Sequence, residues 1–85
     1  MTVKVVGLPG AKTQRTLVNA QEALISRRPK GSIEWVSDIE DMRELGLFYT
    51  PTVLINHKLK STGRIPSVYE ISTWIEEEMA EEVAT

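Results

Sequence analysis

The chain has 85 residues, enough for one small domain with a modest core and too few for two domains. It has no cysteine and one histidine, His57, which excludes disulfides, thiol nucleophiles and thiolate metal sites and leaves no expectation of a zinc site or other metal. The net charge is −2, but residues 1–31 carry six Lys/Arg against one Glu and residues 32–85 carry four against eleven acidic residues, which argues against a general nucleic-acid binder.

The first two predicted elements are a strand and a long helix. The β-branched run Val3–Val6 is typical of a strand buried on both faces, and the turn residues of 7–10 end it. A helical pattern begins at Ala11 and ends near Arg27, where cations, Pro29 and a glycine follow. We expect one stripe of this helix to face the core, made of Leu17, Val18, Gln21, Leu24 and Ile25.

A second strand and a short helix come next. Residues 32–36 alternate, which places Ile33 and Trp35 on one side of a strand and Glu34 on the other. The spacing of Ser37 and Glu40 is that of a capping box, and Gly46 occupies the position where a left-handed residue commonly ends a helix. The apolar residues of this helix, expected to anchor it, are Ile39, Met42 and Leu45.

The last part of the chain predicts a hairpin and a third helix. The runs 52–55 and 58–61 are separated by Asn56-His57, a two-residue link typical of a type I′ hairpin. Ser67 and Glu70 form another capping box, and the helix after it has an expected buried stripe of Val68, Ile71, Ile75 and Met79, with Trp74 beside it. Its acidic segment 76–82 is expected to be solvated, with fraying over 80–85.

The order of elements predicts an α/β fold, βαβαββα, in a single domain over residues 1–85. Two strands joined by a helix form a right-handed parallel pair, and the hairpin is antiparallel, which gives a mixed four-stranded sheet with helices on both faces. No apolar run approaches the roughly 18 residues of a membrane span, and no signal peptide is visible. We therefore expect a cytoplasmic protein without a membrane partner.

The loop VVGLPGAKTQ, residues 5–14, invites comparison with a phosphate-binding loop. Such a loop needs four residues between its first glycine and Gly-Lys-Ser/Thr, whereas only two separate Gly7 from Gly10, and Ala11 precedes Lys12. A nucleotide-hydrolysing site is therefore not expected. Two readings stay open: a plain sharp turn that caps the helix, and an anion site at the helix N-terminus aided by Lys12 and Arg15.

The segment YTPTVLI, in which Thr50-Pro51 precedes the third strand, completes a recognisable order. With the first strand and its glycine loop, the Asp-Ile-Glu helix, Gly46, the hairpin and the segment GRIPS before the last helix, the chain resembles small single-domain thioredoxin/glutaredoxin-like proteins of bacteria and archaea over nearly its whole length. The resemblance implies a thioredoxin-like fold, a cis bond before Pro51, and thiol-disulfide oxidoreductase as the activity of the family.

The family's active-site pair Cys-x-x-Cys falls on Gly10-Ala11-Lys12-Thr13 in this chain. Gly10 and Thr13 occupy the two cysteine positions. Disulfide exchange needs an attacking thiolate, which neither glycine nor a threonine hydroxyl supplies. The resemblance thus implies a scaffold from which the redox chemistry is missing, so we expect no thiol-disulfide enzyme activity, no catalytic residue and no cofactor.

What remains to be expected is a recognition surface. In the family, the residue before the cis proline pairs with an extended substrate as an added strand, which gives Thr50 that role here. The predicted binding groove consists of Leu8, Pro9, Gly10, Lys12, Thr50, Pro51, Arg64 and Ile65, and its expected partner is a protein or extended peptide. Pro51 could equally serve the architecture alone. The alternatives are a protein that self-associates into a homo-oligomer through a sheet edge or Phe48-Tyr49, and an anion or glutathione binder at the first helix.

The aromatic residues outside the groove have architectural interpretations. We expect Phe48-Tyr49 to cover the edge of the core rather than to form an exposed contact for a partner. Trp35 and Trp74 are expected to belong to the core or to cover the sheet.

Overall fold

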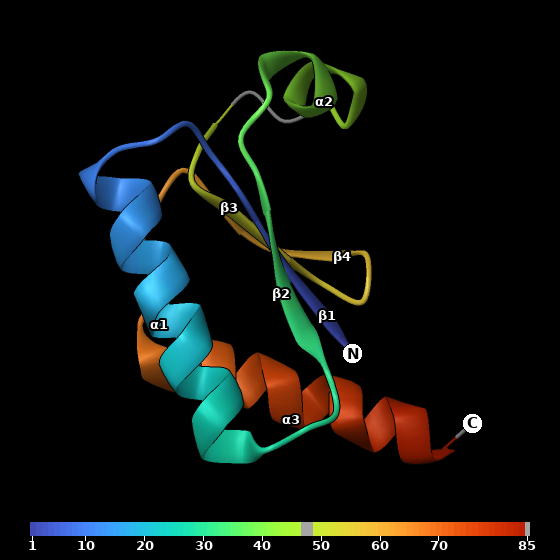
Figure 1. Cartoon of the computed structure of the whole chain (residues 1–85). Coiled ribbons are helices and arrows are strands. Elements are labelled where there is room, and N and C mark those ends of the chain that lie inside the picture. Colours follow the sequence, from blue (N-terminus) through green and yellow to red (C-terminus); the bar gives the residue numbers. More distant parts are fainter. Residues whose placement is uncertain (47–48, 85) are drawn as a thin grey trace.

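The computed structural model describes residues 1–46 and 49–84, and Figure 1 shows how its elements are arranged. Three helices and four strands follow each other as the sequence predicts. In chain order they are β1 (Thr2–Val6), α1 (Ala11–Arg27), β2 (Ser32–Val36), α2 (Ile39–Glu44), β3 (Thr52–Ile55), β4 (Lys58–Thr62) and α3 (Val68–Ala84).

The strands form one mixed sheet in the order β2-β1-β3-β4. β1 runs parallel to β2, with Val3 opposite Ile33, and antiparallel to β3, with Val6 opposite Thr52. β3 and β4 form the predicted hairpin, in which Asn56 and His57 have φ of 50° and 68°, as a type I′ turn requires. The predicted thioredoxin-like α/β architecture is confirmed.

The helices lie on both faces of the sheet. α1 and α3 pack against each other on one face, and α2 lies at one end of the opposite face (Figure 1). The core fills the space between the first face and the two long helices. Its fully buried side chains are Val3, Val5, Ala20, Ala23, Val53, Ile55, Ile71 and Ile75. The two alanines let α1 approach the sheet closely.

The buried face of α1 differs from the predicted stripe. Thr13, Thr16, Ala20 and Ala23 are its buried residues, whereas Ile25 is 67% exposed. The prediction was wrong for Gln21 and Ile25 and right in part for Leu17 and Leu24, which are partly buried against the core. It followed the large apolar residues, whereas the interior of this small domain admits small ones at the closest approach. Gln21, the polar member of the predicted stripe, is exposed in the structure and so is not a buried polar residue.

The prediction for α2 was wrong in two respects. Its N-cap is Asp38, whose carboxylate accepts from the N–H groups of Glu40 and Asp41, so Ser37 and Glu40 form no capping box. None of its residues is buried, and the expected anchors Ile39 and Leu45 are 55% and 46% exposed. α2 is only six residues long and lies at the end of the sheet, where no other described element covers its apolar side chains.

The capping box and the apolar face predicted for α3 are confirmed, whereas the prediction of a solvated acidic segment is wrong for Glu78. The N–H of Glu70 donates to Ser67 Oγ and the N–H of Ser67 donates to Glu70 Oε1, at 3.0 and 3.1 Å, which confirms the capping box. The acidic segment is not uniformly solvated, because Glu78 is only 4% exposed and bonds to Lys60 Nζ at 3.1 Å. The helix continues to Ala84.

Candidate functional site

Three loops meet at the end of the sheet where β1 stops. The register that places Val6 opposite Thr52 brings Gly7 alongside Pro51. The N–H of Gly63 donates to the Pro51 carbonyl at 3.0 Å, which joins the loop before α3 to the same place. Asn19 of α1 donates to the Pro66 carbonyl at 2.9 Å. The sheet register and these bonds thus gather the segments 7–10, 50–51 and 63–66, which hold nearly all of the predicted groove residues.

The N-terminus of α1 opens onto this end of the molecule without a side-chain cap. Gly10 is the N-cap residue, with φ 162° and ψ 176°, and its carbonyl accepts from the N–H of Gln14 at 2.9 Å. No acidic residue lies in the first turn, and Lys12 is exposed. The first N–H groups of a helix have no partner within it, so this end is electropositive.

Gly10 and Thr13, which the resemblance predicts at the two cysteine positions, have opposite environments. Gly10 is exposed, and a Cβ added to it would meet no atom within 4 Å. Thr13 is only 5% exposed, and its Oγ1 would lie 2.5 Å from a Cβ added to Gly7. Gly7 therefore lacks a side chain because Thr13 fills the space beside it. Neither position carries a group that can form a thiolate.

The bond between Thr50 and Pro51 is cis, and Pro51 is fully buried. The segment is held from its flank, because the hydroxyls of Thr52 and Thr62 both lie within hydrogen-bond distance of the Tyr49 carbonyl, at 2.5 and 2.9 Å. Thr50 is half-buried, and among the described residues its backbone N–H and C=O have no hydrogen-bond partner. This is the arrangement that an added extended strand would need.

Tyr49 is 72% exposed, so the prediction that it covers the core edge was wrong; Phe48 lies outside the described residues. The carbonyl of Tyr49 accepts from two hydroxyls, so its backbone is held while its side chain is exposed. Among the other predicted groove residues, Leu8 and Ile65 are 46% and 39% exposed, and Pro9 is exposed. The groove residues thus combine a buried proline with exposed apolar side chains.

Arg64 has a structural partner. Its guanidinium makes a two-point ion pair with Glu70, with distances of 3.0 and 2.7 Å, and thereby braces the first turn of α3. Together with the N–H of Ser67, it lowers the pKa of the Glu70 carboxyl to about 2. Since the guanidinium is engaged in this way, the cations best placed to attract a ligand are Lys12 and Arg15 rather than Arg64.

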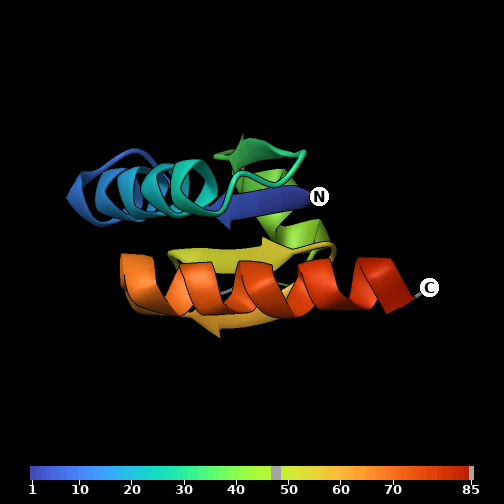
Figure 2. The same cartoon turned by 90° about the horizontal axis from the view of Figure 1, so that it is seen from below.

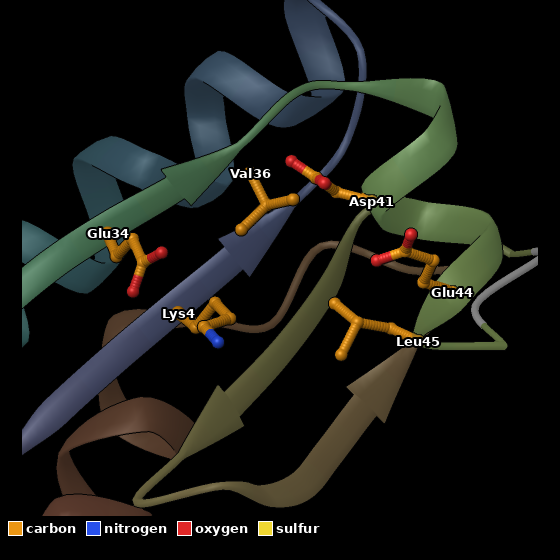
Figure 3. Close-up of a pocket in the computed structure, with 6 residues that line it drawn as sticks. All are labelled: Lys4, Glu34, Val36, Asp41, Glu44 and Leu45. Atoms are coloured by element: carbon orange, nitrogen blue, oxygen red, sulfur yellow. The ribbon is translucent and has the colours of Figure 1, made fainter.

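Two shallow hollows formed by described residues lie beside the predicted groove rather than within it. Figure 3 shows one of about 210 Å³, between α2 and the open face of the sheet, lined by Lys4, Glu34, Val36, Asp41, Glu44 and Leu45. It exists because α2 buries none of its residues against the sheet. The other, of about 420 Å³, runs along the start of α1 past Ala11, Gln14, Arg15 and Val18.

One contact near the site has no signal in the sequence. The indole N–H of Trp35 donates to the Gly7 carbonyl at 2.8 Å and so ties β2 to the loop that leads into α1. Trp35 was predicted as core or sheet cover, but 43% of it is exposed and it is not among the residues of the core. Trp74 is partly buried against the core, as predicted.

Within residues 1–46 and 49–84, no group of three or more His, Asp or Glu side chains is placed to hold a metal ion. In the same residues no helix is both long enough and apolar enough to cross a membrane. The site at the end of β1 therefore has to be judged on its backbone groups, its apolar side chains and the charges of α1.

Comparison with known proteins assigns the chain to a family. A search of curated proteins and a search of solved structures each found no similar protein. A family model described as the thioredoxin domain matches residues 1–76, which cover most of the chain and include all three loops of the site. With the fold and the Thr50-Pro51 loop described above, this match shows that the chain belongs to the thioredoxin domain family.

Proposed function

We propose that this protein is a redox-inactive member of its family that binds an extended peptide segment of another protein across the groove between Gly10 and Thr50-Pro51. Because the chain contains no cysteine, it cannot form the mixed disulfide through which dithiol exchange proceeds. The proposed location of this binding is the cytoplasm.

The backbone of Thr50 is the observation that carries the proposal. Its N–H and C=O are without partners among the described residues, although the residue is half-buried and lies next to a fully buried proline. Backbone groups that are buried away from water are nearly always paired, so an unpaired N–H and C=O stay available where a residue is still partly exposed. An extended segment aligned with Thr50 would supply these bonds, while Leu8 and Ile65 would contact its side chains.

The test starts from a peptide array and continues with the best-binding peptide. This peptide is titrated into isotope-labelled protein, and we expect the Thr50 amide resonance to shift and its exchange with solvent to slow. Leu8→Ala and Ile65→Ala are expected to weaken binding severalfold. Leu59→Ala is the matched control, because Leu59 is 55% exposed on β4, away from the groove. Equal affinities for all three variants would contradict the proposal.

A second candidate is an anion or glutathione binder at the start of α1. It is favoured by the uncapped helix N-terminus, the absence of acid in the first turn, and the hollow lined by Ala11, Gln14, Arg15 and Val18. Titration with phosphate and with glutathione separates it from the first candidate. It requires shifts at the amides of residues 11–13 that Lys12→Ala weakens, and flat titrations would eliminate it.

A further inference from the structure

The outer edge of β2 presents unpaired backbone groups. The N–H of Ser32 donates to the Met1 carbonyl, and the Val36 carbonyl accepts from the N–H of Gly7, at 3.1 and 2.9 Å, so these two residues face β1. Backbone groups alternate in direction along a strand. The N–H and C=O of Ile33 and Trp35 therefore point away from the sheet, where no described residue bonds to them. Figure 2 shows β2 at the margin of the sheet opposite β4.

The two edges of the sheet differ in their protection. β4 is interrupted by a bulge opposite Val53 and Leu54, and it carries Lys58 and Lys60, both paired with acids of α3. Bulges and lysines are the usual devices that keep an edge strand from adding another strand. β2 has neither, and it displays Trp35 with its indole fixed on the Gly7 carbonyl. Of the two edges, β2 is the one suited to pairing.

We infer that β2 pairs antiparallel with β2 of a second copy, around a two-fold axis at Glu34, to form one continuous eight-stranded sheet. Ile33 then lies opposite Trp35 of the partner subunit, and Trp35 lies opposite the partner's Ile33. These are the residues whose backbone groups point outward, so each pair exchanges two hydrogen bonds. Both side chains lie on the α1 face, because Val3 and Val5, their register partners in β1, belong to the core on that face.

Self-complementarity favours a second copy over an unrelated strand. The same register joins Ile33 and Trp35 twice, in the aliphatic-aromatic cross-strand contact that stabilises antiparallel pairs. It also places Lys30, just before β2, opposite the partner's Asp38, just after β2, again twice; both residues are exposed. The basic start and the acidic end of the segment 30–38 thus attract each other only when the strands are antiparallel.

Glu34 is the unfavourable element of this interface and gives it a diagnostic variant. On the axis it lies opposite the partner's Glu34, and like charges in that position weaken pairing. Lys4, its register neighbour in β1, offsets part of this repulsion and lies on the same face of the sheet (Figure 3). Removing the charge with Glu34→Gln is therefore expected to tighten the dimer a few-fold. An association whose interface lies away from Glu34 should respond far less, because the repulsion between two charges falls with their distance.

Sedimentation equilibrium of the full chain from low micromolar to millimolar concentration is the first test, and we expect a reversible monomer-dimer equilibrium. Hydrogen exchange of the Ile33 and Trp35 amides is expected to slow as concentration rises. Ile33→Pro removes one outward N–H donor from each copy and should therefore abolish the dimer. The monomer is expected to stay folded, because proline is tolerated in an edge strand. Ile33→Thr loses the same side chain but keeps the N–H, and should retain a weakened dimer.

Circular dichroism establishes that each variant is folded before it is compared. A chain that stays monomeric at millimolar concentration overturns the inference, even if a peptide from another protein protects the same amides. So does a folded Ile33→Pro variant that dimerises like the parent, or a dimer that Glu34→Gln fails to tighten. None of these outcomes bears on the groove at Thr50, which lies at the end of the sheet rather than along the edge of β2.

Discussion

At the scale of single residues, Gly7 and Gly10 have different reasons to be glycine. A Cβ on Gly7 would lie 2.5 Å from Thr13 Oγ1, whereas one on Gly10 would meet nothing within 4 Å. Gly10 has φ 162°, an extended conformation that any residue adopts. Sequence alone does not separate the two, because both stand in one turn. The difference follows from which residue of α1 turns inward, and there the predicted stripe was wrong.

We therefore expect Gly7→Ala to lower the free energy of unfolding by about 1 to 3 kcal/mol, the usual cost of overpacking a tight interior. Gly10→Ala should leave it nearly unchanged. Urea unfolding measures both. In the background of Thr13→Ala, which removes the clashing hydroxyl, the cost of Gly7→Ala should shrink by more than half. An equal cost in both backgrounds would show that Thr13 is not the obstacle.

The ion pair of Arg64 with Glu70 predicts a pH dependence. Arg64 holds the pKa of Glu70 at about 2 in the folded chain, against 4.5 as the ordinary value. A carboxyl whose pKa is lowered by folding adds stability above its unfolded pKa and loses this contribution as the pH falls through the folded value. The contribution of Glu70 is thus complete above about pH 4.5 and fades towards pH 2.

Both side chains are more than a third exposed, so solvent and salt make this contribution modest. Arg64→Met keeps the aliphatic stem and removes the charge. We expect its deficit in unfolding free energy, relative to the parent, to be largest near neutral pH and to narrow between pH 4.5 and pH 2. A constant deficit across that range in urea titrations would contradict the role of Glu70.

At the scale of elements, the cap residues show where sequence patterns suffice. Ser67 and Glu70 have capping-box spacing and form one, whereas Ser37 and Glu40 have the same spacing and do not. The reason is Asp38, an equally favourable cap residue one position later, whose carboxylate accepts from the N–H groups of Glu40 and Asp41. A local pattern identifies a helix start, but two adjacent cap residues leave its exact position open.

We expect Ser67→Ala to cost about 1 kcal/mol of unfolding free energy, the typical value of an N-cap. Ser37→Ala should cost almost nothing, because Ser37 caps nothing in the structure. Asp38→Ala removes the actual cap of α2, but this helix buries no residue, so its loss should appear as local fraying more than as global instability. Chemical denaturation and amide exchange over residues 39–44 distinguish the two effects.

Glu78 marks what the sequence could not predict about the helices. Periodicity correctly placed Ile71 and Ile75 in the core, because large apolar residues on one face of α3 have only the sheet to meet. The acidic run around Glu78 looked uniformly solvated. Burial of Glu78 depends on its ion pairs with Lys58 and Lys60. These lysines lie on β4, about 20 residues earlier in the chain, so the sequence of the helix alone does not indicate the burial. Partners distant in sequence decide such residues.

At the scale of the whole molecule, the order of elements was enough to predict a mixed four-stranded sheet with a parallel pair and an antiparallel hairpin. It did not predict that β1 and β3 pair antiparallel, which joins the two halves of the sheet. The site was predictable only as a set of loops. Two features of the site depend on contacts that the chain order does not specify: the Thr50 backbone has no hydrogen-bond partner within residues 1–46 and 49–84, and Arg64 is paired with Glu70. The fold is thus easier to predict from the sequence than the ligand that the site would bind.

If the backbone around Gly10 and Thr13 keeps the geometry of a dithiol site and only the thiols are missing, two substitutions to cysteine should restore its chemistry. Gly10→Cys places a thiol where there is open space at an exposed helix N-terminus, which favours the thiolate. Thr13→Cys replaces a buried side chain of similar size, one helical turn away, within the reach of a disulfide.

We expect the double variant to lose both titratable thiols on mild oxidation and, when reduced, to catalyse dithiothreitol-dependent insulin reduction that the parent chain lacks. Gly10→Cys with Gln14→Cys is the matched control, since Gln14 is exposed and one residue out of the spacing. If this control oxidises and turns over as well as Gly10→Cys with Thr13→Cys, the position of Thr13 has no special geometry. The resemblance to a dithiol site would then be one of sequence order alone.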